Sequence, residues 1–325
     1  MKQLVLVVGV GRSGTSLLSG ILGQLGFHIP QPEVEADDTN PRGFGEPRWV
    51  VDFHSRVMAD KRVTVNDSRP AAFKQTAAAA EPLRGELLGW LRGQLDEADR
   101  VVVKDPRTVW FLDLWRACAA DLGARTSFVT MLRHPAEIVA SARRSYGPGL
   151  TEAGRAAAWM NVMLQTERTT RDAPRAFVRY DDLLADWMPE IRRVGARLEI
   201  PALASVDREP AVDAFVDPKL HRNRTTWDDL NVPVRVRDLA EEVWAHVQAG
   251  DQAALDGDRD AYLALYREAE AIAQCSIMAA RPARRRKPAA APAPPPSLRV
   301  RLARRVPAPY RRRLRRAVSK LRPGS

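Results

Sequence analysis

Four short stretches of the chain are rich in β-branched, leucine and aromatic residues. They are residues 4–8, 101–103, 126–132 and 175–180. The first contains no polar residue, which favours a strand buried on both faces of a parallel sheet. Between and after these stretches, apolar residues recur at helical spacing, in residues 17–25, 81–98, 108–122, 136–144, 151–171, 191–198, 236–248 and 259–274. This alternation predicts an α/β fold with three layers, α/β/α, around a central parallel sheet.

The first predicted strand leads through a glycine-rich loop into the first helix. A loop that allows close backbone approach and ends at a helix N-terminus is typical of an anion cradle, most often for phosphate. The spacing of Gly9 and Gly14 copies the P-loop pattern, but Thr15 stands where that pattern has lysine, which makes an ATP or GTP hydrolase a weaker interpretation. The candidate contacts of the cradle are Gly11, Arg12, Ser13, Gly14, Thr15 and Ser16. An ordinary glycine turn without a ligand is the alternative.

Polar residues also follow the other predicted strands. Lys104-Asp105-Pro106-Arg107 follows the second strand, Arg133 follows the third with Ser141 eight residues later, and Tyr180 closes the fourth. The carboxyl ends of parallel strands meet at one edge of a sheet, where α/β folds bind ligands. A guanidinium and a hydroxyl suit a dianionic phosphate. A structural pair of Asp105 with Arg107 is the alternative for the second strand.

Residues 33–49 form a polar stretch marked by proline and glycine and containing one carboxylate of interest, Glu46. Phe44, Trp49 and Phe53 are close to it in sequence, and we expect them to wall a pocket and raise its pKa. A raised pKa near the working pH suits a general base. The alternative is an ordinary loop carboxylate.

Three of these motifs occur in the order that is found in the sulfotransferases that use PAPS (3′-phosphoadenylyl sulfate), and they resemble those of the bacterial members in particular. The motifs are Gly11 to Ser16, Arg133 with Ser141, and Tyr180. The resemblance implies a P-loop-like sulfotransferase fold, PAPS as donor, and no metal. In that family, the loop binds the 5′-phosphosulfate and the arginine and serine bind the 3′-phosphate. The tyrosine lies near the nucleotide.

Other motifs extend the resemblance less evenly. Asn40 to Glu46 and Lys104 to Arg107 are similar to segments of bacterial sulfotransferases, the first of which ends in a glutamate thought to be the base. Many members also have a late Arg-Lys-Gly loop over the 3′-phosphate, and this chain lacks that tripeptide. Arg222 and Arg224 are the candidates for its role, against the alternative of a solvated basic loop.

The resemblance therefore implies transfer of a sulfuryl group from PAPS to a hydroxyl acceptor. Glu46, or Asp105, would take the acceptor proton, while Arg12 and Lys104 would stabilise charge on the leaving oxygen. We expect a carbohydrate or glycolipid acceptor. The alternatives are a P-loop kinase or nucleotide phosphotransferase, and a non-catalytic nucleotide-binding protein docked to a membrane by its tail.

The positive charge of the chain lies in its C-terminal tail. The net charge is +11, but residues 281–325 hold 16 Lys or Arg and no acid, which leaves 35 basic and 40 acidic residues elsewhere. We expect a sulfotransferase domain over 1–278, an Ala/Pro/Arg-rich linker over 279–297 and a basic tail over 298–325.

The tail is amphipathic or disordered, and in the first case it would bind an anionic membrane surface. Without a signal peptide or spanning segment, a cytoplasmic protein is expected, peripheral on the inner face of the membrane if the tail binds there. No nucleic-acid partner is expected, because the tail has few aromatic residues.

Overall fold

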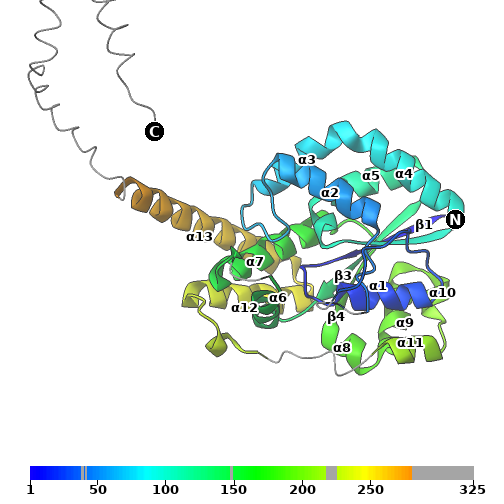
Figure 1. The fold of residues 1–325 in the computed structure, drawn as a ribbon. Helices are drawn as coiled ribbons and strands as arrows, with labels where there is room; N and C mark the ends of the chain where they lie inside the picture. The colour runs from blue at the N-terminus through cyan, green and yellow to red at the C-terminus, as the bar shows by residue number, and fades with distance from the viewer. Residues whose placement is uncertain (38–39, 41, 147–148, 217–224, 280–325) are drawn as a thin grey trace, which may run out of the picture. The chain divides into compact units, whose positions relative to one another are not determined.

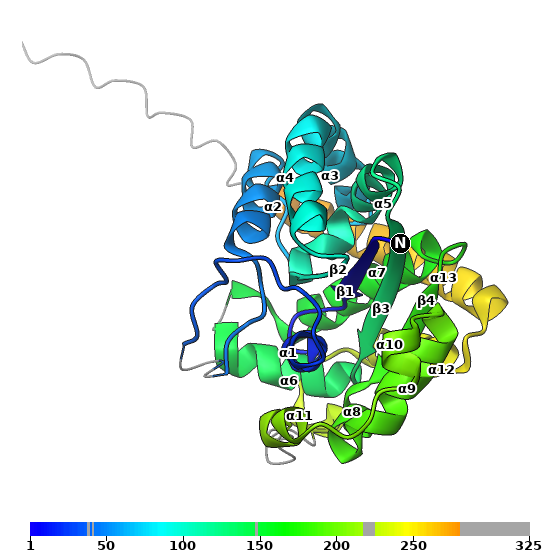
Figure 2. The same cartoon turned by 90° about the vertical axis from the view of Figure 1, so that its right-hand side faces the viewer.

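The computed structural model describes residues 1–37, 40, 42–146, 149–216 and 225–279. Its centre is a parallel sheet of four strands (Figure 1), whose order β2-β1-β3-β4 can be followed in Figure 2. The strands are β1 (Gln3–Val8), β2 (Arg100–Lys104), β3 (Arg125–Leu132) and β4 (Arg175–Arg179). They coincide with the four predicted stretches to within a few residues. Because all four run parallel, their carboxyl ends lie along one edge of the sheet, as the sequence predicts.

Alternate side chains of each strand enter two different cores. In β1, Leu4, Leu6 and Val8 belong to one core, while Val5 and Val7 belong to the other. All five are at most 1% exposed. Because β1 has apolar side chains on both faces, both faces must be shielded from water, and this requires a helical layer on each side of the sheet.

The two helical layers lie on opposite faces of the sheet (Figure 2). One face is covered by α1 (Thr15–Gln24), α8 (Tyr180–Ala185), α9 (Trp187–Leu198), α10 (Pro201–Ala204) and α11 (Pro210–Phe215). The other is covered by α2 (Arg48–Asp60), α3 (Ala72–Ala80), α4 (Arg84–Glu97), α5 (Leu112–Asp121), α6 (Pro135–Tyr146), α7 (Glu152–Thr169) and α12 (Val234–Ala249). The predicted three-layer α/β/α fold is confirmed.

Some predicted boundaries are wrong, and five helices were not predicted, namely α2, α3, α8, α10 and α11. Residues 108–122 form the 3-10 helix η2 (Pro106–Trp110) followed by α5, because Asp105 caps a turn that begins with Pro106. Tyr180 begins α8 and does not close β4. Both α2 and α3 lie in the stretch between residues 48 and 80. Two further 3-10 helices are η1 (Glu81–Leu83) and η5 (Trp227–Asp229).

The chain divides into two compact units, Met1–Ala269 and Glu270–Ser325. The last described helix is α13 (Gln252–Ala279). Residues 217–224 and 280–325 lie outside the described residues, so the linker, the tail, Arg222 and Arg224 remain predictions. Within the described ranges, no helix combines the length and apolar character that a membrane crossing needs.

Candidate active site

The loop between β1 and α1 has an unusual backbone. Gly9, Arg12 and Gly14 have positive φ angles of 144°, 74° and 97°. A Cβ atom at Gly9 would lie 2.9 Å from the Ser13 hydroxyl and 3.1 Å from the Met131 carbonyl, so only glycine fits there. Arg12 adopts its conformation at a cost of order 1 kcal/mol, and such strain often accompanies a functional site. No side chain caps α1 at Gly14, and Leu17 is the first residue of the helix whose N–H donates to the Gly14 carbonyl (3.0 Å), so the N–H groups of Thr15 and Ser16 are available to an anion.

Tyr180 joins this loop to the end of β3. A Cβ atom at Gly14 would lie 2.3 Å from Cδ2 of Tyr180, which means that the ring packs directly on the loop backbone. The other partner of the ring is Arg133, whose guanidinium carbon lies 4.6 Å from the ring centroid. Three strand ends that are distant in sequence therefore meet at one place.

Arg133 and Ser141 both contact the loop, as the sequence predicts for one site. The Arg133 Nη1 donates to the carbonyl oxygen of Arg12 (3.1 Å), and the Arg12 Nε donates to Ser141 Oγ (3.2 Å). The Arg133 Nε donates to Glu137 (2.9 Å). Among the described residues, Arg133 Nη2 and Ser13 Oγ are buried and have no hydrogen-bond partner. Two buried polar groups beside an anion cradle fit a further phosphate ligand, because each would otherwise lose its hydration without compensation.

A buried ion pair lies on the other side of the loop. Lys104 Nζ donates to Glu46 Oε1 at 2.5 Å, and the side chains are 2% and 10% exposed. Lys104 also donates to Ser16 Oγ (3.1 Å) and to the Phe44 carbonyl (3.2 Å), so it connects Glu46 to the first turn of α1. Burial raises the pKa of Glu46 above its ordinary value, and the charge of Lys104 opposes that rise.

The pKa of Glu46 therefore rises as expected, but the proposed aromatic walls are wrong in part. Phe44 lines the cleft at Glu46. Trp49 instead stacks between Phe53 and Trp90, with ring centroids 5.2 and 4.6 Å away, as part of the core. The α2 helix that turns these two residues inward was not predicted.

Asp105 and His54 form a second buried pair, behind the cleft. Both side chains are fully buried, and His54 Nδ1 donates to Asp105 Oδ2 at 2.7 Å. The other carboxylate oxygen accepts from Arg107 Nη1 (2.7 Å). The indole of Trp115 donates to His54 Nε2 (3.0 Å), so His54 is neutral with its proton on Nδ1. Burial lowers the pKa of His54, although Asp105 opposes this. Burial alone would raise the pKa of Asp105, but its bonds to His54 and Arg107 hold it below its ordinary value.

One cleft of about 720 Å³ unites most of these groups. Its lining includes the predicted residues Gly11, Arg12, Gly14, Thr15, Ser16, Glu46, Lys104, Arg133, Ser141 and Tyr180. Ser13 and Asp105 are not part of this lining. Arg48 from α2 and Arg155 from α7 line the cleft but were not predicted. The sequence does contain a pattern from which a buried position of Arg155 could have been predicted. Arg155 lies on the same face of the helix as Trp159 and Val162, which are buried.

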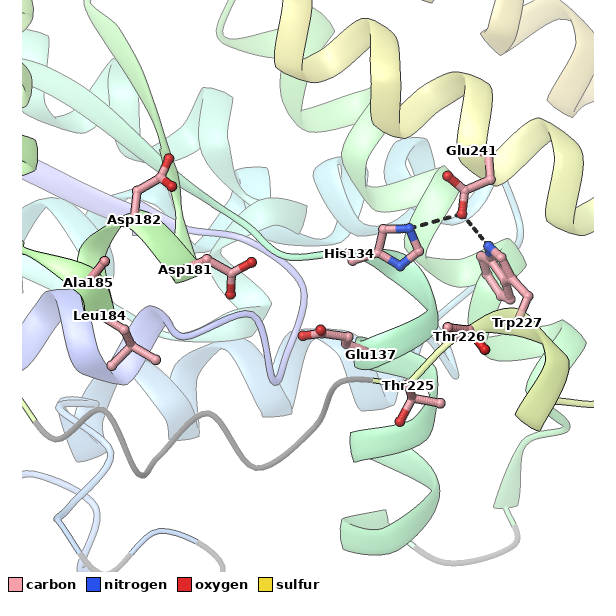
Figure 3. A pocket seen from close by; sticks show the side chains of 10 residues that line it. All are labelled: His134, Glu137, Asp181, Asp182, Leu184, Ala185, Thr225, Thr226, Trp227 and Glu241. Atoms are coloured by element: carbon pink, nitrogen blue, oxygen red, sulfur yellow. Dashed lines mark hydrogen bonds and ion pairs between the residues drawn. The ribbon is translucent and has the colours of Figure 1, made fainter.

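A second cavity, of about 1030 Å³, borders the site on the side of α6 and α12 (Figure 3). Glu137 lines it and accepts from Arg133, which lines the first cleft, so this ion pair lies between the two cavities. Glu241 from α12 accepts from both the ring of His134 (2.9 Å) and the indole of Trp227. In the described part of the chain, no cluster of three or more His, Cys, Asp or Glu side chains could hold a metal ion.

Three solved structures are similar to this chain at low identity. The sulfotransferase domain of the olefin synthase from Synechococcus PCC 7002 is 15% identical, with a TM-score of 0.44, over 76% of this chain and 96% of that chain. The sulfotransferase domain from the curacin biosynthetic pathway is 14% identical, with a TM-score of 0.44, over 76% and 98%. The sulfotransferase STF1 from Mycobacterium tuberculosis H37Rv is 14% identical, with a TM-score of 0.40, over 75% and 77%.

The sequence comparisons differ in outcome. No curated protein matches this chain. The sequence model of the sulfotransferase family matches residues 4–204, which is more than half of the chain. That segment runs from β1 to α10 and contains both the glycine-rich loop and Arg133. On this match, the chain belongs to the sulfotransferase family.

Proposed function

We propose that this protein transfers a sulfuryl group from PAPS to a hydroxyl acceptor. The observation that carries the proposal is the contact of Arg133 with the glycine-rich loop. This contact places two groups suited to anions side by side, at the ends of β1 and β3. A donor with a phosphosulfate at one end and a 3′-phosphate at the other needs two such neighbouring sites. The missing P-loop lysine argues against a nucleoside triphosphate.

The donor would lie across the loop and the end of β3. The Arg12 side chain and the loop N–H groups up to Ser16, except that of Ser13, which donates to the Val10 carbonyl at 3.1 Å, would hold the 5′-phosphosulfate. The hydroxyls of Ser13, Thr15 and Ser16 would lie nearby. Arg133 and Ser141 would hold the 3′-phosphate, and the buried Arg133 Nη2 would donate to it. Tyr180 would pack beside the nucleotide, and Arg222 and Arg224 would cover the 3′-phosphate.

Glu46 is the proposed general base. Its carboxylate lines the cleft next to Ser16 and Lys104, where an acceptor hydroxyl can reach the bound sulfuryl group. As the acceptor oxygen bonds to sulfur, its proton passes to Glu46. The bond from sulfur to the bridging oxygen breaks, and its electron pair leaves with the 5′-phosphate. Lys104 and Arg12 stabilise that charge, so positioning and electrostatics supply the catalysis.

Asp105 is assigned a positioning role in place of the alternative role as base. Its side chain is fully buried, and its two oxygens accept bonds from His54 and Arg107. A carboxylate held in this way cannot reach an acceptor proton, and its lowered pKa makes it a weak base.

Binding of adenosine 3′,5′-bisphosphate tests the donor site. By isothermal titration, the bisphosphate should bind without metal and ATP with Mg²⁺ should bind much more weakly. Arg133→Ala should weaken bisphosphate binding by about ten- to a hundredfold, since it removes charged hydrogen bonds. The matched control is Arg125→Ala at the opposite end of β3, where the arginine binds Glu199 at 2.7 Å on the surface. Tighter binding of ATP with Mg²⁺ would favour the kinase alternative.

Glu46→Gln tests the base. Transfer of labelled sulfate should fall by about a hundredfold or more while the bisphosphate binds as before. Because burial raises the pKa of Glu46, the rate should fall as the pH drops through that raised pKa, where the base becomes protonated. Full activity of the variant would assign the proton transfer to another group.

The acceptor class and the location of the protein belong to the same proposal. A sugar or glycolipid hydroxyl is proposed as acceptor, with the protein in the cytoplasm and its basic tail on the inner face of the membrane. Sedimentation of the full chain with vesicles tests the tail. The full chain should bind anionic vesicles, lose this binding at high salt, and show no binding to zwitterionic vesicles.

A further inference from the structure

The cleft has an apolar surface on the side of Glu46. Five residues that line the cleft there have apolar side chains, and none of them is assigned to the donor. They are Val34, Phe44, Val51, Val65 and Pro106. All five are half-buried, so part of each residue remains in contact with water. Apolar side chains that line a cleft and are still partly hydrated are typical of a site that binds an apolar part of a ligand.

Hydrogen bonds place Val34 and Phe44 next to Glu46. The backbone N–H of Val34 donates to the carbonyl oxygen of Glu46 at 2.8 Å. The carbonyl oxygen of Phe44 accepts from Lys104 Nζ at 3.2 Å, and the same ammonium group binds the Glu46 carboxylate at 2.5 Å. Both residues are therefore immediate neighbours of the proposed base, and both line the cleft.

The other three apolar residues come from segments that are fixed to the same part of the site. Val51 lies near the start of α2, the helix that begins two residues after Glu46. Pro106 begins η2, two residues after the end of β2. The segment that contains Val65 is held against η2, because the indole N–H of Trp110 donates to the Val65 carbonyl at 3.4 Å. The three segments thus continue the apolar surface around Glu46.

The charged residues close to these positions do not need the acceptor as a partner. Lys104 is bound to Glu46. Arg107 is bound to the buried Asp105 at 2.7 Å. Arg48 is exposed and therefore hydrated. The surface that gains most from contact with an acceptor is therefore the apolar one, because contact with an apolar group removes both surfaces from water.

We propose that the acceptor carries an alkyl segment close to the hydroxyl that receives the sulfuryl group. The alkyl segment packs on Val34, Val51 and Val65 while the hydroxyl points to Glu46. Of the acceptors named above, a glycolipid or another lipid-like alcohol fits better than a free sugar, whose other hydroxyl groups would lose water at these residues without gaining hydrogen bonds. The inference rests on the proposed function, because it places the acceptor beside Glu46.

Two series of acceptors with increasing chain length test the inference. The 1-alkanols from ethanol to octanol carry the reacting hydroxyl on the chain, and the alkyl β-glucosides from methyl to octyl carry it on a sugar. Two values are measured for each compound below its micelle concentration: kcat/KM with labelled PAPS, and Kd for the enzyme saturated with adenosine 3′,5′-bisphosphate. In at least one series, each added CH₂ group should improve both values about three- to fourfold until the apolar surface is covered. The series that responds distinguishes an aliphatic alcohol from a glycolipid.

Polar replacements in the apolar surface identify the residues responsible. Val51→Thr and Val65→Thr keep the shape of the side chain but add a hydroxyl. For the longest acceptors of the responding series, each variant should lower kcat/KM about three- to tenfold, mainly through KM, with a smaller effect on the shortest acceptors. The matched control, Val236→Thr, changes a half-buried valine of α12 that lines neither cavity, and it should keep the wild-type dependence on chain length. Unchanged binding of adenosine 3′,5′-bisphosphate shows that each variant is folded.

Two results would overturn the inference. The first is the same kcat/KM and Kd for the shortest and the longest member of both series, or no binding of any member. The second is a gain with chain length that is as large in Val51→Thr and Val65→Thr as in the wild type, which would place the alkyl chain away from this surface. Failure of the proposed function differs from both, because the wild-type protein would then not bind adenosine 3′,5′-bisphosphate.

Discussion

Replacing Lys104 with methionine leaves the carboxylate of Glu46 buried without its cation. The two charged atoms are 2.5 Å apart, and neither side chain is more than 10% exposed. Removing one member of a buried ion pair costs about 3 to 5 kcal/mol of folding free energy, because the other charge keeps its desolvation cost without the attraction. Lys104→Met should lose about this much at pH 8.

The loss should depend on pH, with a sign that follows from the structure. Burial already raises the pKa of Glu46, and the loss of Lys104 removes the charge that opposes this rise. Glu46 in the folded variant therefore binds a proton more tightly than in the unfolded chain, so the stability of the variant relative to the wild type increases as the pH falls. As the pH falls, a growing fraction of the carboxyl groups is neutral, and the neutral form replaces the buried charge. The remaining loss, about 1 to 3 kcal/mol, reflects the Phe44 carbonyl left without its donor.

A double-mutant cycle separates these two contributions. Unfolding in urea is measured at pH 8 and pH 5 for wild type, Lys104→Met, Glu46→Gln and the double variant. The coupling free energy should be about 2 to 3 kcal/mol at pH 8 and much smaller at pH 5, and the double variant should recover most of the loss at pH 8. Equal losses at both pH values, or no recovery in the double variant, would refute the assignment of a buried charged pair.

Two other predictions concern the loop and the buried histidine. Gly14→Ala should cost about 2 to 5 kcal/mol in urea unfolding, because its φ is 97° and its Cβ would lie 2.3 Å from the Tyr180 ring. Gly89→Ala in α4, with open space around the new Cβ, should stabilise the protein slightly, and a similar loss in both variants would contradict this explanation. Since burial lowers the pKa of His54, the unfolded chain binds a proton first as the pH falls, and wild-type stability should fall from about pH 7 to 5. His54→Asn, which can still donate to Asp105, should be less stable at pH 7 and lose less on acidification. A parallel pH dependence would contradict a neutral His54.

The sequence alone predicted the strands, the first loop and the position of Arg133 and Ser141 after the third strand, next to that loop. Apolar periodicity is local, so it places each strand without knowledge of the rest of the chain. The topology of a parallel sheet then brings the strand ends together at one edge, and residues that follow the strands meet there. This is why the approach of Arg133 to the first loop, where it donates to the carbonyl of Arg12 121 positions away, could be predicted from two short motifs.

Only the tertiary structure decided which charged side chains pair inside the site. Glu46 meets Lys104 across 58 positions, and His54 meets Asp105 across 51. Glu46 lies in a stretch without periodicity and His54 in a helix that was not predicted, so no local pattern gave their partners. Burial shifts the pKa values of both groups, and it depends on how α2 and the segment before it pack against the ends of β1 and β2. Packing between segments that are distant in sequence cannot be predicted from the pattern of any one short segment.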